Sequence, residues 1–325
     1  MQSGKSLRFT TGHSDCSRPV AVIDIGTNTL RLLIGCVKSG RIVRIASDRK
    51  VTRLGKNLRE THVLNHDSIE LSIRTITKFK VKCDENNVMR IIAVGTSALR
   101  EAEDGSHFLR TIKEKTGIDV MVISGDEEAE LTLKGIRGQK SFFSAPCSII
   151  VDVGGGSTEF IICKDQIIKV SIPVGAVNLF ELFIKYDTPT SSELYDIKDF
   201  LIAEFNPVLS PMQYRKIYQS CGLIATGGTP ATLSAMHLNL TSYDADKVHG
   251  QSLSYAEIKS MFEKLIGLPL KERGNIPGLG HERADIILSG TMIIMTIMEL
   301  LHAQELIVSD HGLMEGVLLE AACFS

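Results

Sequence analysis

Hydrophobic residues along this chain lie either in short runs or at every third or fourth position. The alternation of these two patterns predicts alternating strands and helices. Short apolar runs separated by turn residues predict three successive strands near the start. Apolar residues then recur every three or four positions over 68–85, the spacing of a helix with one buried face. The remaining elements expected in this half are strands at 90–96 and 118–124, and helices at 107–116 and 125–136. The first three strands are expected at 19–26, 30–37 and 41–48.

The same order of elements begins again near residue 147. Three more strands are expected there, then helices, strands and a terminal helix. In each half the first strand carries an acid just before a glycine turn, Asp24 before Gly26 and Asp152 before Gly154. This repetition predicts two similar α/β domains that face each other, with a ligand cleft between them. The strands are expected at 147–156, 157–164, 166–174, 221–228 and 305–312, and the helices at 176–185, 191–205, 254–267, 281–301 and 312–322.

Composition narrows the class of protein. The chain has 325 residues, 43% of them hydrophobic, so a large folded core is expected. Its net charge of −2 gives no overall signature for nucleic acid or for a membrane surface, and neither partner is expected. The apolar stretch at 286–298 is too short for a bilayer, which takes about 20 residues. No leader with an apolar segment is recognised in residues 1–18, which we expect to be a flexible tail.

The seven cysteines form no C-x-x-C pair, and their number is odd. Neither a disulfide framework nor a zinc site is therefore expected. A reducing cytoplasm is the simplest setting for such a set of thiols.

Three glycine turns are candidates for phosphate binding. Glycine lets backbone N–H groups approach an anion, and neighbouring hydroxyl groups add donors. The alternative is that the glycines only make tight hairpins, but two turns with matching acids favour phosphate. None of the three has a P-loop or G-x-G-x-x-G pattern. The candidates are Gly26, Thr27, Asn28, Gly154, Gly155, Gly156, Ser157, Thr158, Gly227, Gly228 and Thr229.

The two strand-end acids suggest a cation. Asp24 and Asp152 are expected at the carboxyl ends of facing strands, where they can hold a hydrated divalent ion between them. Magnesium commonly binds through one or two carboxylates together with phosphate oxygens and water. The sequence therefore predicts Mg²⁺ as a cofactor.

Five stretches together resemble one known family. They are GTSALREA (95–102), ISGDEEAEL (123–131), VDVGGGSTE (151–159), IATGGT (224–229) and SDHGLMEGV (309–317). In this order they resemble the exopolyphosphatase and guanosine pentaphosphatase (Ppx/GppA) family, in its short form, within the actin-like ATPase superfamily. The resemblance implies two ribonuclease-H-like domains with an inter-domain cleft. It divides the chain into a first domain of 19–143 plus the C-terminal helix 312–325, and a second domain of 144–311.

The resemblance also implies roles for individual residues. Glu128 corresponds to the base that activates water, and Arg100 to a phosphate-binding arginine. Glu159 joins Asp24 and Asp152 as a metal ligand. With Glu128 in this role, Glu127 is expected to face solvent, because successive helix residues point about 100° apart. Without the resemblance, Glu127 and Glu128 indicate an ordinary acidic helix N-terminus. Arg100 reads as a surface residue paired with Glu101 or Glu103.

The activity implied is that of an exopolyphosphatase, which releases orthophosphate from the end of inorganic polyphosphate. The alternative is a guanosine pentaphosphate (pppGpp) 5'-phosphohydrolase that uses the same site. Different classes left open are a nucleotide-gated binding module and a small-molecule kinase. The resemblance further implies a homodimer and raises a monovalent cation such as K⁺ as a second ion.

A basic strip follows the first two strands. Seven basic side chains and one acid, Asp48, lie in 41–59. The strip either follows a polyanion or forms a solvated strand edge. Further along, Arg283 and Asp285 are expected to pair at a helix start. His249, His281 and His311 are expected to cap loops rather than bind metal. The basic residues of the strip are Arg41, Arg44, Arg49, Lys50, Arg53, Lys56 and Arg59.

Overall fold

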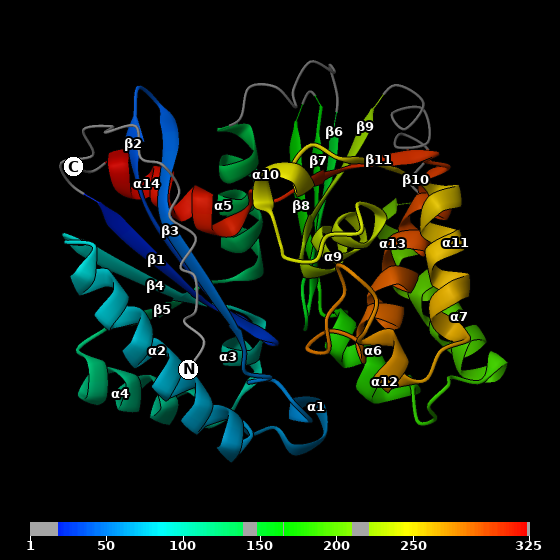
Figure 1. The fold of residues 1–325 in the computed structure, drawn as a ribbon, viewed down its shortest axis with the longest axis horizontal. Helices are drawn as coiled ribbons and strands as arrows, with labels where there is room; N and C mark the ends of the chain where they lie inside the picture. The colour runs from blue at the N-terminus through cyan, green and yellow to red at the C-terminus, as the bar shows by residue number, and fades with distance from the viewer. Residues whose placement is uncertain (1–18, 139–147, 165, 210–220, 324–325) are drawn as a thin grey trace.

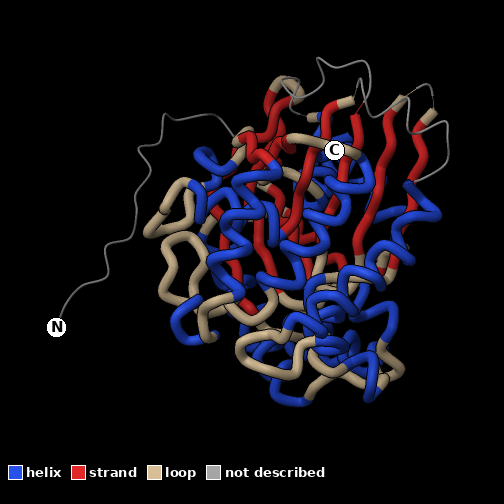
Figure 2. Tube along the Cα trace, turned by 90° about the vertical axis from the view of Figure 1, so that its right-hand side faces the viewer, coloured by secondary structure: helices blue, strands red, loops and turns tan. Residues whose placement is uncertain are grey.

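The protein is described by a computed structural model covering residues 19–138, 148–164, 166–209 and 221–323. Two sheets stand side by side, and helices α5 (Gly125–Arg137) and α14 (Leu313–Cys323) lie between them (Figure 1). The strands of both sheets run through the upper part of the molecule in Figure 2, and many of the helices gather below them. The tail predicted at 1–18 and the domain boundary predicted between residues 143 and 144 fall outside the described residues.

The first sheet has five strands in the order β3-β2-β1-β4-β5. Strands β1, β2 and β3 form an antiparallel meander, and β4 and β5 are parallel to β1. Alternate residues of β1 face opposite sides, as a strand requires. Ile23 faces α2 (His66–Glu85) and α4 (Gly105–Thr116), whereas Val22 faces α14. The strands are β1 (Val20–Ile25), β2 (Thr29–Lys38), β3 (Arg41–Val51), β4 (Arg90–Gly95) and β5 (Val120–Val122).

The second sheet has the order β10-β11-β9-β6-β7-β8. Its meander β6-β7-β8 and the parallel strands β9 and β11 repeat the plan of the first sheet, and β10 is an added antiparallel edge. The duplicated order gives two similar α/β halves, as the sequence predicted, with the ribonuclease-H-like plan that the resemblance implied. The strands are β6 (Ser148–Val153), β7 (Thr158–Cys163), β8 (Ile167–Ile172), β9 (Gly222–Gly227), β10 (Ser252–Ser254) and β11 (Glu305–Ser309).

One face of the second sheet carries the largest core. Helix α13 supplies much of it, with 12 of its 15 residues buried. The opposite face packs on α5 through Ala129, Leu133 and Ile136. The helices of the large core are α6 (Ala176–Phe183), α7 (Ser191–Leu209), α9 (Gly228–His237), α11 (Tyr255–Ile266) and α13 (Ile287–Leu301).

Helices α5 and α14 cross at glycine residues, which have no side chains to keep the two backbones apart. A Cβ on Gly316 would lie 1.8 Å from the Leu131 carbonyl oxygen, and one on Gly135 would lie 2.0 Å from that of Gly312. Such distances are far inside van der Waals contact, so only glycine permits this approach. Because α14 also packs on the first sheet, the crossing joins the two halves. The domain limits at 143 and 312 stay predictions.

Some elements differ from the expectation. The helix expected from residue 281 begins at Ile287, after a series of turns, and the strand expected over 118–124 covers only Val120–Val122. The short elements were not predicted, because three to five residues are too few to show a repeating pattern of hydrophobic positions. They are β10 and the helices α1 (Leu58–Thr61), α3 (Ser97–Glu101), α10 (Ala245–Val248) and α12 (Leu270–Arg273).

The cysteines depart from the sequence-based expectation. Cys36 and Cys221 are each disulfide-bonded, whereas Cys83 and Cys163 are buried free thiols. The expectation of no disulfide was therefore wrong, because odd number and wide spacing do not report on proximity in the fold.

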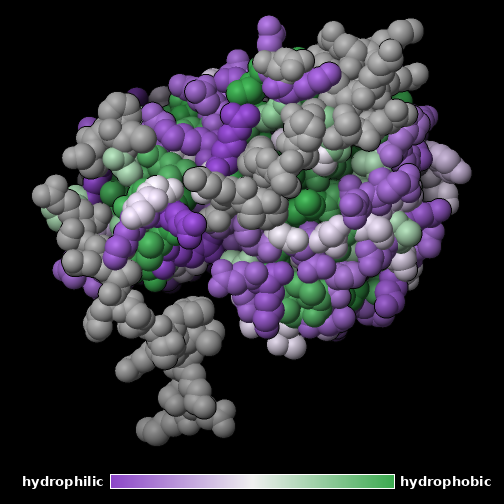
Figure 3. All heavy atoms as spheres, turned by 90° about the horizontal axis from the view of Figure 1, so that it is seen from above, coloured by the Kyte–Doolittle hydropathy of each residue, from purple (hydrophilic) through white to green (hydrophobic). Residues whose placement is uncertain are grey.

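Within the described ranges, no helix is both long and apolar enough to cross a bilayer, α13 included. Hydrophilic residues predominate among the described residues of the face drawn in Figure 3, and hydrophobic ones are exposed between them.

Candidate active site

The turns that follow the first strands of the two sheets meet at one small cavity of about 80 Å³. Both strand-end acids, the glycines of all three turns and Glu128 line it. It lies between the halves, so neither sheet alone forms it. The residues around it are Asp24, Gly26, Thr27, Asn28, Thr29, Arg31, Thr96, Ser97, Glu128, Asp152, Val153, Gly154, Gly155, Gly156, Ser157, Ala176, Gly227, Gly228, Thr229, Arg283 and Ile286.

Two of the glycine turns touch each other across the cavity. A Cβ on Gly156 would lie 2.3 Å from the Ser97 hydroxyl oxygen and 2.9 Å from that of Thr27. The third turn leaves β9 with Gly227 at φ +101°, a conformation that favours glycine. These positions leave backbone exposed where side chains would block an incoming anion.

Asp24 and Asp152 are buried at the ends of their strands. The Oδ2 atom of Asp24 accepts from Arg31, 2.7 Å from Nε and 2.5 Å from Nη2. Its Oδ1 atom is buried and has no hydrogen-bond partner. Asp152 accepts from the Thr132 hydroxyl at 3.2 Å, and burial raises the pKa of this carboxyl, with nearby Asp24 adding to the rise.

A free carboxylate oxygen of this kind suits a cation. Among the described residues, no group of three or more His, Cys, Asp or Glu side chains could hold a metal ion. The donor set fits a metal that takes two carboxylates and completes its shell with phosphate and water oxygens, which is how Mg²⁺ commonly binds.

Glu128 enters the cavity from the first turn of α5. The helix begins with a capping box in which Ser124 accepts from the Glu127 N–H and the Glu127 side chain accepts from the Ser124 N–H. Glu127 is thus exposed, as predicted, while Glu128 is buried one position later. Burial raises the pKa of Glu128 to about 7, against the opposing effect of Arg100. A base with a pKa near neutrality can take a proton from water at physiological pH.

Arg100 lies against this carboxylate and is absent from the cavity lining. Its Nη1 donates to Glu128 Oε2 at 2.8 Å and to the Ile123 carbonyl at 2.9 Å. Among the described residues Arg100 pairs with Glu128 and with neither Glu101 nor Glu103, the alternatives raised by the sequence. Glu101 instead accepts from the Ser97 hydroxyl at 2.6 Å. The position of Arg100 therefore favours holding Glu128 over binding phosphate.

Two other predicted site residues also lie outside the lining. The Thr158 hydroxyl donates to the Val174 carbonyl at 2.6 Å and is fully buried. Glu159 is buried and accepts from Ser171 at 2.8 Å. Burial, together with Glu128 and Asp152, raises the pKa of Glu159 well above its usual range. Because Glu159 lies outside the cavity lining, its role as a metal ligand stays a prediction.

The sequence missed two arginines in the cavity wall. Arg31 interrupts an otherwise buried strand, and such a break in an apolar run was the available signal. The Arg283 side chain packs against Gly228 and, within the described ranges, makes neither an ion pair nor a hydrogen bond. Burial lowers its pKa to about 10, with Arg49 and Arg31 adding to the decrease. The expected pair with Asp285 is wrong, since Asp285 binds Arg53 at 2.5 Å.

A second cavity of about 290 Å³ adjoins the first. The two share Arg31, Gly227, Gly228 and Arg283 in their walls. Arg44, Arg49 and Tyr243 stand in the wall of the second cavity alone. The small cavity thus opens toward a larger space with a basic wall.

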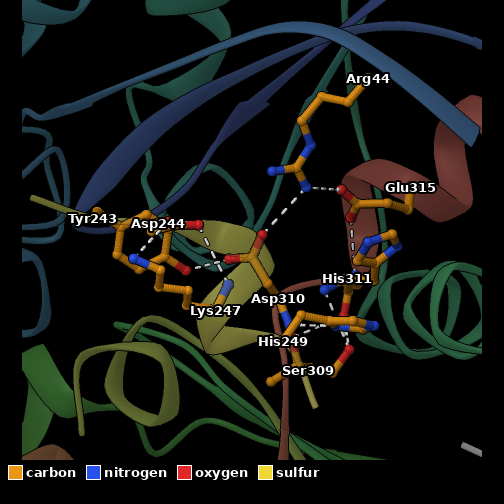
Figure 4. A network of polar contacts seen from close by, with 11 residues as sticks. Arg44, Tyr243, Asp244, Lys247, His249, Ser309, Asp310, His311 and Glu315 are labelled. Atoms are coloured by element: carbon orange, nitrogen blue, oxygen red, sulfur yellow. Dashed lines mark hydrogen bonds and ion pairs between the residues drawn. The ribbon is translucent and has the colours of Figure 1, made fainter. Parts of the chain in front are cut away.

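The basic strip on β3 is partly neutralised by ion pairs. Arg44 reaches both Asp310 and Glu315 at 3.2 Å, and Lys50 reaches Glu282 at 3.4 Å. Figure 4 shows Arg44 with these two acids, and the rings of His249 and His311 lie nearby, tilted by 39° to each other. His249 accepts from the Asp310 N–H, which agrees with the loop-capping role expected of it.

Comparison with known proteins gives a consistent family. Residues 33–323 match the model of the Ppx/GppA phosphatase family. Exopolyphosphatase 2 of Mycobacterium tuberculosis is 28% identical over 93% of this chain and 98% of its own length. A guanosine-5'-triphosphate,3'-diphosphate pyrophosphatase of Aliivibrio fischeri is 26% identical over 91% of this chain, which spans 58% of that protein.

Solved structures with a similar fold come from the same family. The Ppx/GppA family member of Aquifex aeolicus has 35% identity and a TM-score of 0.78, over 94% of this chain and 98% of that one. An exopolyphosphatase from Cytophaga hutchinsonii has 27% identity and a TM-score of 0.85, over 94% and 98% of the two chains.

Proposed function

The chain belongs to the Ppx/GppA phosphatase family, and on this basis we propose that it is an exopolyphosphatase that hydrolyses the terminal phosphate of inorganic polyphosphate to orthophosphate. The observation that carries the proposal is the meeting of three glycine turns, two acids and Glu128 around one cavity. The geometry suits an anion whose end is held by backbone N–H groups while a base stands beside it. The similarity of the whole chain to exopolyphosphatases supports the same reaction.

The residues would divide the work as follows. The backbone N–H groups of the turns at Gly26, Gly154 and Gly227 and the hydroxyl groups of Thr27 and Ser157 bind and orient the terminal phosphate. Glu128 accepts a proton from the attacking water, and Arg100 fixes its carboxylate. Hydrolysis of a phosphoryl group depends mostly on positioning and charge neutralisation. The shortened chain leaves through the larger cavity, where Arg283 supplies a cation.

Asp24 and Asp152 would hold Mg²⁺, which supplies positive charge to phosphate oxygens when bound. The free Oδ1 atom of Asp24 supports this assignment. Glu159 is not included, because it lies outside the cavity lining. The requirement for K⁺ stays a prediction.

The second candidate function is the 5'-phosphohydrolysis of guanosine pentaphosphate. The relative from Aliivibrio fischeri supports it, as does the size of the larger cavity. Both substrates present a terminal phosphate to the same turns. The two candidate functions therefore differ in what the larger cavity holds.

One experiment tests the proposal. Phosphate release is measured from long-chain polyphosphate and from pppGpp, with Mg²⁺ and with EDTA, using the wild-type protein and Glu128→Gln. We expect Mg²⁺-dependent release from polyphosphate that the substitution abolishes. Release from pppGpp alone would favour the second candidate, and release from neither would reject both.

A homodimer and a cytoplasmic location also stay predictions. The disulfide-bonded Cys36 and Cys221 weigh against a reducing setting, so the oxidation state of the purified protein should be measured by thiol titration. Light scattering at known concentration would give the oligomeric state.

A further inference from the structure

The wall of the larger cavity carries more positive charge than its carboxylates neutralise. Four arginines line it, and two of them are paired, Arg31 with Asp24 and Arg44 with Asp310 and Glu315. The other two, Arg49 and Arg283, have no carboxylate partner among the described residues. Such uncompensated cations in one cavity repel each other, so an anion bound among them would be stabilised.

Arg49 owes its place beside the active site to strand register. It stands directly opposite Arg31 in the antiparallel pair of β2 and β3. Like charges at directly opposite positions are destabilising. Both side chains lie on the same face of the sheet, and Arg31 points to Asp24. Arg49 is therefore the cation next to the active-site wall, on the side of the larger cavity.

A fixed aromatic ring orients this guanidinium. Arg49 lies over the ring of Tyr243, 4.8 Å from its centroid, as in a cation–π contact. The Tyr243 hydroxyl donates to Asp310, which also accepts from Arg44 (Figure 4). The acid nearest to Arg49 in the sequence, Asp48, forms an ion pair with Lys82 at 2.8 Å. Arg49 is thus positioned while its charge is left available.

We propose that Arg49, held over Tyr243, binds the phosphate groups that follow the scissile bond and so helps determine which substrates the protein prefers. This inference rests on the proposed function. The shared chemistry is a phosphate group on the leaving side, which belongs either to a polyphosphate chain or to the 3'-diphosphate of guanosine pentaphosphate. In this proposal Tyr243 acts through Arg49, which it supports.

The test compares Arg49→Gln with Arg41→Gln, which removes the same charge from the same strand at a residue outside both cavities. KM and kcat are measured on tripolyphosphate, long-chain polyphosphate and pppGpp. We expect Arg49→Gln to raise KM about 10- to 100-fold for the long chain, for pppGpp or for both, as loss of a hydrogen bond to a charged group would. The rise should be smallest for tripolyphosphate, and kcat should change less than KM.

The substrate with the larger rise identifies the source of the anion. An equal rise for all three substrates, or no rise beyond that of Arg41→Gln, would overturn the proposal. Tyr243→Leu should raise the same KM values by less, and should add nothing in the Arg49→Gln background because the ring acts through Arg49. Additive effects would reject the supporting role of Tyr243.

A failure of the proposed function is distinguishable. If the wild-type protein releases no phosphate from any substrate, calorimetry measures the binding of long-chain polyphosphate to the wild type, to Arg49→Gln and to Arg41→Gln. Weaker binding only in Arg49→Gln would still support the anion site. Equal binding by all three proteins would overturn it.

Discussion

The Arg100 guanidinium and the Glu128 carboxylate form a hydrogen-bonded ion pair, with Nη1 and Oε2 2.8 Å apart. The two residues are 28 positions apart in the chain and come from helices α3 and α5. The second bond of Arg100, to the Ile123 carbonyl, fixes the guanidinium to the chain just before α5. Arg100 is therefore placed to orient Glu128 and to moderate the rise in its pKa.

Removing this cation should shift the pH profile. Arg100 opposes the rise that burial causes in the Glu128 pKa, so Arg100→Gln should raise that pKa further. Since the base must be ionised, kcat/KM of the wild type should fall as pH decreases below about 7, and in the variant this fall should begin at higher pH. The measurement is kcat/KM for polyphosphate from pH 5.5 to about 9. An unchanged profile with a higher KM would instead indicate phosphate binding by Arg100.

Replacing the base should remove turnover and leave binding. Glu128→Gln keeps the shape of the side chain but cannot accept a proton, so kcat should fall by about 10²- to 10⁴-fold. The affinity for polyphosphate, measured by calorimetry, should remain close to wild type. The exposed neighbour gives a matched control, because Glu127→Gln should keep full turnover. Equal losses in the two variants would exclude Glu128 as the base.

The same carboxyl should make stability depend on pH. Its folded pKa of about 7 lies above the value expected in the unfolded chain, about 4.3. Its contribution to stability is therefore fully present below about pH 4.3 and is lost as pH rises to about 7. Glu128→Gln stays neutral, so its unfolding free energy relative to wild type should rise over this range, on the order of a few kcal/mol. Denaturant unfolding at several pH values measures it, and a difference independent of pH would contradict the raised pKa.

The contact between the glycine turns should be sensitive to a single methyl group. In Gly156→Ala the new Cβ would lie 2.3 Å from the Ser97 hydroxyl oxygen, which must shift together with the turn. We expect kcat/KM to fall at least about tenfold, because misplacement by about 1 Å in a positioning site has effects of this size or larger. Gly222→Ala, where a Cβ meets nothing within 4 Å, is the control. Wild-type kinetics in Gly156→Ala would show that the turns do not act together.

A methyl group added at the crossing of α5 and α14 should lower the stability of the protein. In Gly316→Ala the Cβ would lie 1.8 Å from the Leu131 carbonyl oxygen, so α5 and α14 must separate. Overpacking of this kind costs about 1–3 kcal/mol of unfolding free energy. Gly267→Ala, whose Cβ would lie 3.9 Å from the Lys264 carbonyl oxygen, should be nearly neutral. Equal stability of both variants in denaturant titrations would contradict the tight crossing.

The sequence by itself determined the duplicated α/β plan, the three glycine turns and the two strand-end acids. These features are local, since strand periodicity, a terminal acid and a glycine run are all read within about ten residues. The capping box between Ser124 and Glu127 at the start of α5 is local as well. The motifs then led to the family.

Only the tertiary structure decided which side chains pair with each other when they are far apart in the sequence. Asp285 pairs with Arg53 rather than Arg283, Arg100 holds Glu128, and Glu159 lies outside the cavity lining. Arg49 lies next to the active-site wall only because the register of β2 and β3 sets it opposite Arg31. The physical reason is that ion pairs, burial and cavity walls depend on three-dimensional distance, which the packing of the two sheets about α5 and α14 sets and sequence spacing does not encode.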